Sequence, residues 1–547
     1  MRNLTLASAA LAAILPLTLA ACAATGPAAP AVVAEADTPG ADVSVTRDGD
    51  QWTVDYTFSE DAPVWAFIRS SLLMETRQPW RPADWTVVTP GVVLERVGHL
   101  DILRSLDGGP VPRQVRLQLA PRNHNLEADY PVLAFTDGSV ALFSGAFDVF
   151  ALSSLDDARD LPEDLNGQDI AIRNARVTWR DRSGPVLVEG ERQRQAVTED
   201  GALYVLFGQT RMKEAERIVT VADPQLPAWI SAAIESWAPG VADYYARRLG
   251  PGQTDRPTIM ASWGGPTPGL QSMGGSVLPG LIVMSFEGIG NAERSDESAA
   301  YIQWFIGHES AHFWLGQTVR YERSRDSWIT EGGADLMAVR ATKALAPSYD
   351  ALGMLQEEVD DCAALAVRPI EGAAARGDHR AFYACGAVFA LVAERAQFRA
   401  TGGDWFDFLR PLIDANREDG VLTRAEWLDH LDAVSGDPTL RARIETFLDT
   451  GTPDPVTALA DLLHAAGISH RVEEGRVVLT ERGGGRFPAL KCLVPVPNRR
   501  YGPGHAHAQR QQLRRGRRRY PAHSLHVRRL GPRLAGVRPQ LRYCRPV

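Results

Sequence analysis

The stretch WFIGHESAHFWLGQ, residues 304–317, carries two histidines four positions apart, with a glutamate directly after the first. In a helix this spacing places His308 and His312 on one face, so both imidazoles can point to a single Zn²⁺ ion. Glu309 is displaced by about 100° around the helix and would lie beside the metal, where it can contact a water molecule. A helix that carries two histidines without any metal is the alternative interpretation.

A second segment, SWITEGGADLMAVRA (residues 327–341), contains a candidate for the third protein ligand of a catalytic zinc. Eighteen residues separate His312 from Glu331, which begins another helical pattern. Asp335 lies one turn further and can accept a hydrogen bond from an imidazole N–H, which would orient that ring from behind the metal. We therefore predict one Zn²⁺ per chain, held by His308, His312 and Glu331.

These motifs resemble those of the gluzincin zinc metallopeptidases, and within them the aminopeptidase N-like branch. That branch has His-Glu-x-x-His followed by Glu after eighteen residues, and 312–316 and 328–334 also match its His-x-Trp-x-Gly and Trp-x-x-Glu-Gly-x-Ala segments. The resemblance covers about residues 270–395, under a quarter of the chain. It implies a thermolysin-like catalytic domain and a peptide or protein substrate. It also implies that Glu309 activates the attacking water.

The same resemblance implies a donor for the oxyanion. The family has a Tyr-x-x-Gly-Ala segment on a later helix, and FYACGAVFALVAERA (residues 382–396) matches it, with Cys385 in place of the usual lysine. By this resemblance the hydroxyl of Tyr383 stabilises the tetrahedral intermediate. A phenol suits that role because it stays protonated at neutral pH. A tyrosine that only packs in the helical core is the alternative.

One segment departs from the family pattern. Where the family has a glutamate that binds the free amino terminus of the substrate, GGSVLPGLI (residues 274–282) has Val277. Valine cannot pair with an ammonium group, so we expect cleavage inside peptides or at ends recognised in another way. Glu287, nearby in the sequence, could replace the family's glutamate as the residue that binds the amino terminus if the loop shifts. The alternatives are an aminopeptidase that acts on free N-termini, and a catalytically silent lipoprotein that keeps zinc for binding.

The start of the chain has the features of a secretory signal. MRNLTLASAALAAILPLTLAAC (residues 1–22) has a basic residue, an apolar stretch and small residues before Cys22. Its end resembles the lipobox of bacterial lipoproteins, in which the cysteine becomes the lipidated first residue. We therefore predict a lipid anchor at Cys22 in the bacterial cell envelope. Ala23 favours the outer membrane, facing the periplasm. An ordinary cleaved signal is the alternative.

The rest of the chain predicts an α+β multidomain protein. After an Ala- and Pro-rich tether (23–42), residues 43–215 show short alternating segments typical of an antiparallel β sandwich or saddle. Helical patterns dominate the predicted peptidase domain (216–450), whose metal helix should begin at Ser295 or Asp296. Residues 451–486 suggest a small helix and hairpin.

The final segment, residues 487–547, differs in composition from the rest. From Pro488 onward it has fourteen Arg, one Lys and no acidic residue, so the remaining residues carry a net charge of −24. A basic arm and translation out of frame are the two interpretations, and the second explains the sudden loss of acidic residues. We expect no nucleic acid partner, and we do not count His505 and His507 as ligands.

Two further features have alternative interpretations. Cys362 and Cys385 could pair outside the cytoplasm or remain buried thiols. DANREDGVLTRAEW (residues 414–427) resembles a calcium loop, but its glycine and last glutamate are each one position late. A capping box formed by Thr423 and Glu426 after a turn explains this segment better.

Overall fold

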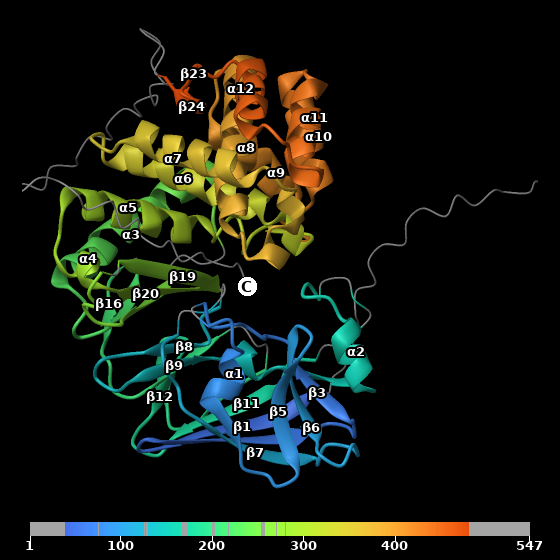
Figure 1. Cartoon of the computed structure of the whole chain (residues 1–547). Coiled ribbons are helices and arrows are strands. Elements are labelled where there is room, and N and C mark those ends of the chain that lie inside the picture. The colour runs from blue at the N-terminus through green and yellow to red at the C-terminus, as the bar shows by residue number, and fades with distance from the viewer. Residues whose placement is uncertain are drawn as a thin grey trace, which may run out of the picture.

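The computed structural model describes residues 39–480, except 75, 125, 127–128, 166–167, 169, 171–172, 200–202, 217, 253–256, 270 and 279. Cys22, most of the tether and the basic segment lie outside the described residues. Figure 1 shows a β-rich unit built from the first part of the chain and a mainly helical unit built from the second. The predicted fold class is thus confirmed. No helix in the described part is long and apolar enough to cross a membrane.

The N-terminal unit consists of short strands whose side chains alternate between core and solvent. In β2 the tryptophan, valine, tyrosine and phenylalanine of QWTVDYTF are buried and the residues between them are not. This alternation buries one face of the strand. The strands are β1 (Ala41–Asp48), β2 (Gln51–Phe58), β3 (Val64–Phe67), β4 (Trp85–Val87), β5 (Val92–Val97), β6 (Leu100–Ser105), β7 (Gln114–Leu119), β8 (Val132–Ala134), β9 (Val140–Phe143), β10 (Val149–Leu152), β11 (Arg176–Asp181), β12 (Val186–Val188), β13 (Glu191–Gln193), β14 (Ala196–Thr198) and β15 (Tyr204–Phe207). Two short helices, α1 (Trp80–Asp84) and α2 (Leu155–Asp160), interrupt them.

These strands form three sheets. Their orders are β14-β11-β1-β2-β7-β4, β10-β3-β6-β5 and β13-β12-β15-β9-β8. Neighbouring strands run antiparallel, as predicted, with one exception: β1 and β11 pair in parallel. More than a hundred residues separate these two strands, and a connection of that length allows parallel pairing.

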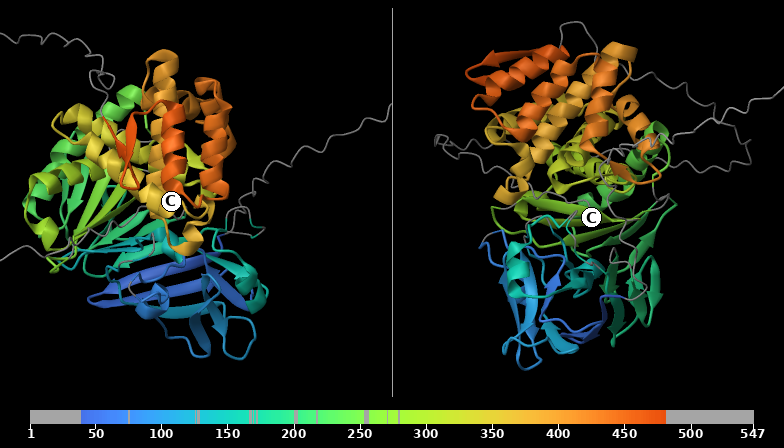
Figure 2. Two further views of the ribbon diagram at one scale, coloured as in Figure 1. Left: turned by 45° about the horizontal axis from the view of Figure 1, so that its top comes forward. Right: turned by 90° about the vertical axis from the view of Figure 1, so that its right-hand side faces the viewer.

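A fourth sheet forms the base of the helical unit. Its order is β16-β17-β18-β20-β19, with β16 (Met212–Glu214), β17 (Val219–Ala222), β18 (Thr258–Trp263), β19 (Ser272–Leu278) and β20 (Leu281–Glu287). In Figures 1 and 2 strands β19 and β20 lie between the helices and the N-terminal strands. The side chains of β19 follow this arrangement, because Met273 and Val277 pack in the core of the helical unit whereas Leu278 packs in that of the N-terminal unit.

The helices are packed above this sheet. They are α3 (Ala228–Leu249), α4 (Ile289–Ala292), α5 (Asp296–Ala311), α6 (Trp328–Leu345), α7 (Ala351–Leu365), α8 (Arg380–Thr401), α9 (Trp405–Ala415), α10 (Arg424–Ser435), α11 (Pro438–Asp449) and α12 (Pro455–Ala466). Strand β21 (Arg320–Tyr321) pairs with β22 (Val421–Leu422), and the described chain ends in the hairpin of β23 (His470–Glu473) and β24 (Arg476–Leu479). The helix and hairpin expected after residue 450 are therefore present.

Side-chain caps begin two of the helices where the sequence predicts them. Ser295 caps α5 in a capping box with Ser298, which confirms the predicted start of the metal helix. Thr423 and Glu426 form the predicted capping box at α10.

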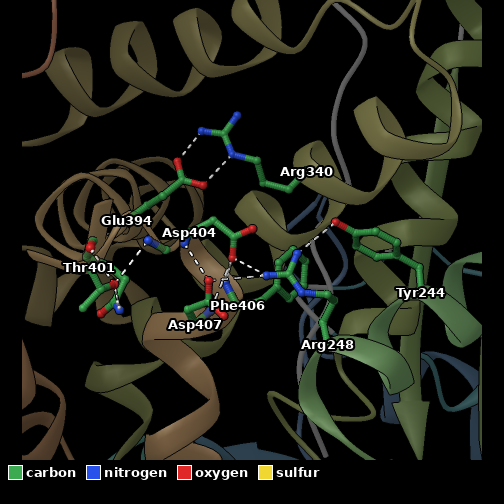
Figure 3. A network of polar contacts seen from close by, with 10 residues as sticks. Tyr244, Arg248, Arg340, Glu394, Thr401, Asp404, Phe406 and Asp407 are labelled. Atoms are coloured by element: carbon green, nitrogen blue, oxygen red, sulfur yellow. Dashed lines mark hydrogen bonds and ion pairs between the residues drawn. The ribbon is translucent and has the colours of Figure 1, made fainter. Parts of the chain in front are cut away.

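Two glycines allow α6 and α8 to cross in close contact. A Cβ atom on Gly332 would lie 2.1 Å from the carbonyl carbon of Gly386, and one on Gly386 would lie 2.4 Å from the carbonyl oxygen of Trp328. The same two helices are joined by Arg340, whose Nε donates to Glu394 Oε1 at 2.7 Å (Figure 3). This crossing determines where the first turns of both helices meet.

The structure resolves the question of the two cysteines. Cys362 of α7 and Cys385 of α8 form a disulfide bond. Both residues are buried in the helical core, so the bond connects the interiors of the two helices.

Candidate metal centre

Three ligand atoms converge where α5 meets α6. Nε2 of His312 lies 3.1 Å from Nε2 of His308, and Glu331 Oε2 lies 3.5 Å and 3.6 Å from these two nitrogens. All three side chains are at most 2% exposed. In a tetrahedral zinc site with bonds of about 2.0–2.1 Å, ligand atoms lie about 3.3 Å apart. The triangle observed here has the size that such a site requires.

Local structure explains this convergence. Helix α5 ends at Ala311 and His312 is its C-cap residue, still in the helical conformation, so the four-residue spacing from His308 is helical. Glu331 belongs to the first turn of α6, where it extends back toward α5. The spacer of eighteen residues thus brings a carboxylate to two imidazoles already aligned by one helix.

Hydrogen bonds behind the rings orient both imidazoles. Nδ1 of His312 donates to the carbonyl oxygen of Leu315 at 2.8 Å, and Nδ1 of His308 lies 2.7 Å from Asp335 Oδ1. Because a carbonyl oxygen only accepts, the Nδ1 of His312 must carry the proton and its Nε2 holds a lone pair. Nε2 of His308 faces this lone pair at 3.1 Å. Two lone pairs would repel each other at this distance, so either a proton on Nε2 of His308 or a metal ion must lie between the two nitrogens.

The electrostatics of the centre also favour a cation. Burial lowers the pKa of His308, but Asp335, Glu331 and Glu309 outweigh burial and raise the pKa well above its usual value. Burial raises the pKa of Glu331, but the imidazoles of His312 and His308 outweigh it and lower the pKa to about 2. Neither carboxylate oxygen of Glu331 accepts a hydrogen bond. An anionic carboxylate in this position is a ready metal ligand, and the donor set of two His and one Glu fits Zn²⁺.

Glu309 lies against the neighbouring strand β19. It is fully buried, and a Cβ atom on Gly275 would lie only 2.8 Å from its carboxyl carbon. Any larger residue at position 275 would therefore push Glu309 away from the strand. No residue spacing predicts this contact of Gly275, although two consecutive glycines in a strand, Gly274 and Gly275, are typical of a place where another segment approaches closely.

Tyr383 is placed beside the ligands from a third helix. Its ring stacks on that of His308, with centroids 5.7 Å apart and planes inclined by 23°. It lies on α8, three residues before Gly386, which permits the close crossing with α6. The structure thus brings together His308, His312, Glu331, Asp335 and Tyr383 from three helices, with Glu309 next to the first histidine.

Val277 lies on the side of β19 that faces the helices. Side chains alternate along a strand, so Val277 points to the same face as Gly275, which contacts Glu309. Its side chain is 1% exposed and belongs to the helical core. The suggestion that Glu287 could take the place of a glutamate here is wrong. Glu287 pairs with Ser272, five positions away along β19, or about 16 Å at 3.3 Å per residue.

Arg380, the first residue of α8, is the main residue near the centre that the sequence analysis missed. Its Nη1 lies 3.8 Å from Asp335 Oδ2, and its other donors pair with Glu358 and Asp361 of α7. Burial raises the pKa of Glu358 to about 8, an effect that Arg380 opposes. No spacing rule connects residues 335, 358 and 380, so their meeting depends on the packing of three helices.

Comparisons with known proteins agree with this fold. The chain resembles the crystal structure of an aminopeptidase N family protein from Idiomarina loihiensis, with 10% sequence identity, a TM-score of 0.51 and coverage of 79% of each chain. It also matches an M1 zinc metallopeptidase from Deinococcus radiodurans bound to Tyr-Ser-Ala, with 15% identity, a TM-score of 0.44, and coverage of 76% of this chain and 95% of that one. No protein-family model matches the chain, and no curated protein matches it. At 10% identity the likeness to the Idiomarina structure shows a shared fold and nothing more.

Proposed function

We propose that this chain is a zinc-dependent peptidase, with zinc held by His308, His312 and Glu331. The observation that carries the proposal is the triangle of ligand atoms, 3.1–3.6 Å on its sides, with Glu309 and Tyr383 next to it. The fold shared with an aminopeptidase N family protein supports it. A zinc ion in this site would act as a Lewis acid toward water and toward the scissile carbonyl.

The residues around the ligands have the chemistry for amide hydrolysis. Glu309 takes a proton from water as the water oxygen bonds to the carbonyl carbon, and it delivers that proton to the leaving nitrogen as the C–N bond breaks. Tyr383 donates its hydroxyl to the oxyanion that forms on the carbonyl oxygen. Asp335 keeps the ring of His308 in one tautomer.

A catalytically silent, zinc-retaining binding lipoprotein is the rival function. A purely structural zinc site needs neither a buried carboxylate beside the first histidine nor a tyrosine stacked on it. Glu309 and Tyr383 therefore favour hydrolysis over binding alone.

The test is incubation of the purified protein with a mixed peptide library, with cut positions read by mass spectrometry. We expect cleavage that a chelator abolishes and added zinc restores, and no comparable cleavage by the Glu309→Gln variant. If wild-type protein that contains zinc cuts no peptide in the library, the binding function is favoured instead. The cut positions also distinguish cleavage inside peptides, which we propose, from removal of N-terminal residues.

We further propose that a lipid on Cys22 anchors this peptidase in the bacterial envelope, in the outer membrane facing the periplasm. The proposal rests on the apolar segment of residues 1–22 and its small residues before the cysteine. In the natural host, Cys22→Ser should move the protein from the membrane fraction to the soluble fraction. Continued membrane association of that variant would contradict the anchor.

A further inference from the structure

Arg380 connects the metal centre to a helix that carries no metal ligand. Its Nη2 lies 2.8 Å from Glu358 Oε2 and its Nε lies 2.8 Å from Asp361 Oδ2, both on α7. On its other side, Nη1 lies 3.8 Å from Asp335 Oδ2 of α6. The guanidinium, whose side chain is 13% exposed, is thus surrounded by carboxylates from two helices.

Asp335 divides its two oxygens between this guanidinium and the imidazole of His308. Oδ1 receives the contact from His308 Nδ1 at 2.7 Å, while Oδ2 is buried, makes no hydrogen bond and faces Arg380. The ion pair is longer than a hydrogen bond and involves the other oxygen of Asp335. Arg380 therefore balances the charge of Asp335 without competing for Oδ1, which orients the imidazole of His308.

Without Arg380, the buried carboxyl groups of Asp335 and Glu358 would have no guanidinium to offset their negative charge. Asp335 and Glu358 act on each other as like charges, and both side chains are at most 3% exposed. Removal of Arg380 would leave the buried carboxylate of Asp335 without the cation that faces Oδ2, and a buried charge without its partner is costly enough to shift Asp335 from its position behind His308. The ring of His308 would then lose the contact that fixes its orientation.

We propose that Arg380 is a positioning residue for the metal centre. It holds Asp335 between α6 and α7, and the zinc affinity of this chain depends on it. This inference rests on the proposed zinc site. It assigns to Arg380 an effect on the metal that Arg380 exerts only through Asp335 and His308.

Arg340 offers a matched control. It joins the same two helices, α6 and α8, through its buried pair with Glu394 (Figure 3). Arg340 lies five residues beyond Asp335 on α6, about 7.5 Å further along the helix axis. Loss of either arginine removes ion pairs that connect neighbouring helices. Only Arg380, however, contacts Asp335, the residue that orients His308.

The experiment measures zinc affinity by competition with a chromophoric chelator, on full-length wild-type protein and on Arg380→Met, Arg380→Lys and Arg340→Met. Circular dichroism selects conditions in which all four are folded. We expect Arg380→Met to weaken zinc binding by about tenfold or more, the scale for losing a residue that orients a ligand. Arg340→Met should stay within about twofold of wild type, and Arg380→Lys should restore part of the affinity, because one ammonium cannot serve three carboxylates. The visible spectrum of Co²⁺-loaded protein should change for Arg380→Met and not for Arg340→Met.

Equal zinc affinity in Arg380→Met and Arg340→Met would overturn the inference. If Arg380→Met does not fold, Arg380→Lys is compared with Arg340→Lys, and equal affinities there would also overturn it. Absence of zinc binding by wild-type protein would instead contradict the proposed function, so the two failures are distinguishable.

Discussion

The N-terminal unit and the metal centre both bury ionisable side chains, and they differ in how the charge is balanced. In the N-terminal unit the guanidinium of Arg81 is fully buried, lies 3.9 Å from the ring centroid of Phe67, and has its Nε 3.7 Å from Asp101 Oδ2. At the metal centre Glu331 is buried against two imidazoles, and neither of its oxygens accepts a hydrogen bond.

This difference separates a structural cluster from a binding site. The chain supplies its own cation to Asp101, and the rings of Trp80 and Trp85 also lie next to that cation, 4.7 Å and 4.6 Å from it. At the metal centre the three candidate ligand atoms face one another at 3.1–3.6 Å. Buried charge paired with the chain's own arginine needs no ligand, whereas two imidazoles and a carboxylate that converge on one point have the chemistry of a metal-binding site.

The largest expected effect is the loss of the metal itself. Wild-type protein should contain one zinc per chain, and His308→Ala or Glu331→Ala should lose most of it, because a catalytic zinc depends on all three protein ligands. Elemental analysis of the purified proteins measures this. Arg81→Met is the control for the comparison and should keep its zinc. Carefully prepared wild-type protein without any metal would remove the basis of the comparison.

The next largest effect concerns catalysis with the metal still bound. Glu309→Gln keeps the shape of the side chain and removes its basicity, so zinc content should be unchanged. Turnover should fall by at least about 10², the usual scale for a lost general base. Peptide cleavage is measured at equal zinc content. Unchanged turnover would exclude Glu309 from proton transfer.

Local sequence patterns predicted which side chains converge at the metal centre, because the relevant contacts lie within one helix or follow a known spacer. His308 and His312 are related by a single helical turn, and Ser295 marks where that helix begins. The contacts that support the centre were not predictable in this way. Gly275 approaches Glu309 across a strand–helix packing, and Arg380 reaches Asp335 from a different helix. Tertiary packing brings such pairs together, and no periodicity in the sequence encodes it.

The same distinction holds for the N-terminal unit. Alternation in segments such as QWTVDYTF correctly predicted strands, since one face of each is buried. The parallel pairing of β1 with β11 and the burial of Arg81 were not predicted. Trp80 and Trp85 flank Arg81 in the sequence, but its contacts with Phe67 and Asp101 depend on tertiary packing.

A smaller effect, on stability alone, is expected for the buried cluster around Arg81 in the N-terminal unit. Arg81→Met should lower the free energy of unfolding by up to about 3 kcal/mol, because it removes the fully buried one of the two cations beside Asp101, while Arg96 remains 3.4 Å from Asp101 Oδ1. The midpoint of urea unfolding, followed by tryptophan fluorescence, measures the change. Arg116→Met breaks an exposed pair with Asp55 and should shift the midpoint far less. Equal shifts in both variants would show that the buried cluster contributes no more to the free energy of unfolding than an exposed ion pair does.

The smallest expected effect concerns the amino terminus of the substrate. Val277 faces the metal side of β19 and is 1% exposed, so position 277 offers no carboxylate to an ammonium group. An ammonium that loses water without gaining a partner costs several kcal/mol, so a free amino terminus should add little to binding. We therefore expect a peptide and its N-acetylated form to be cleaved at rates within about threefold of each other, which corresponds to about 0.7 kcal/mol. Val277→Glu is the matched variant, and acetylation should slow its cleavage more than that of wild type. If acetylation abolishes cleavage by the wild-type protein, another residue recognises the amine and the chain acts as an aminopeptidase.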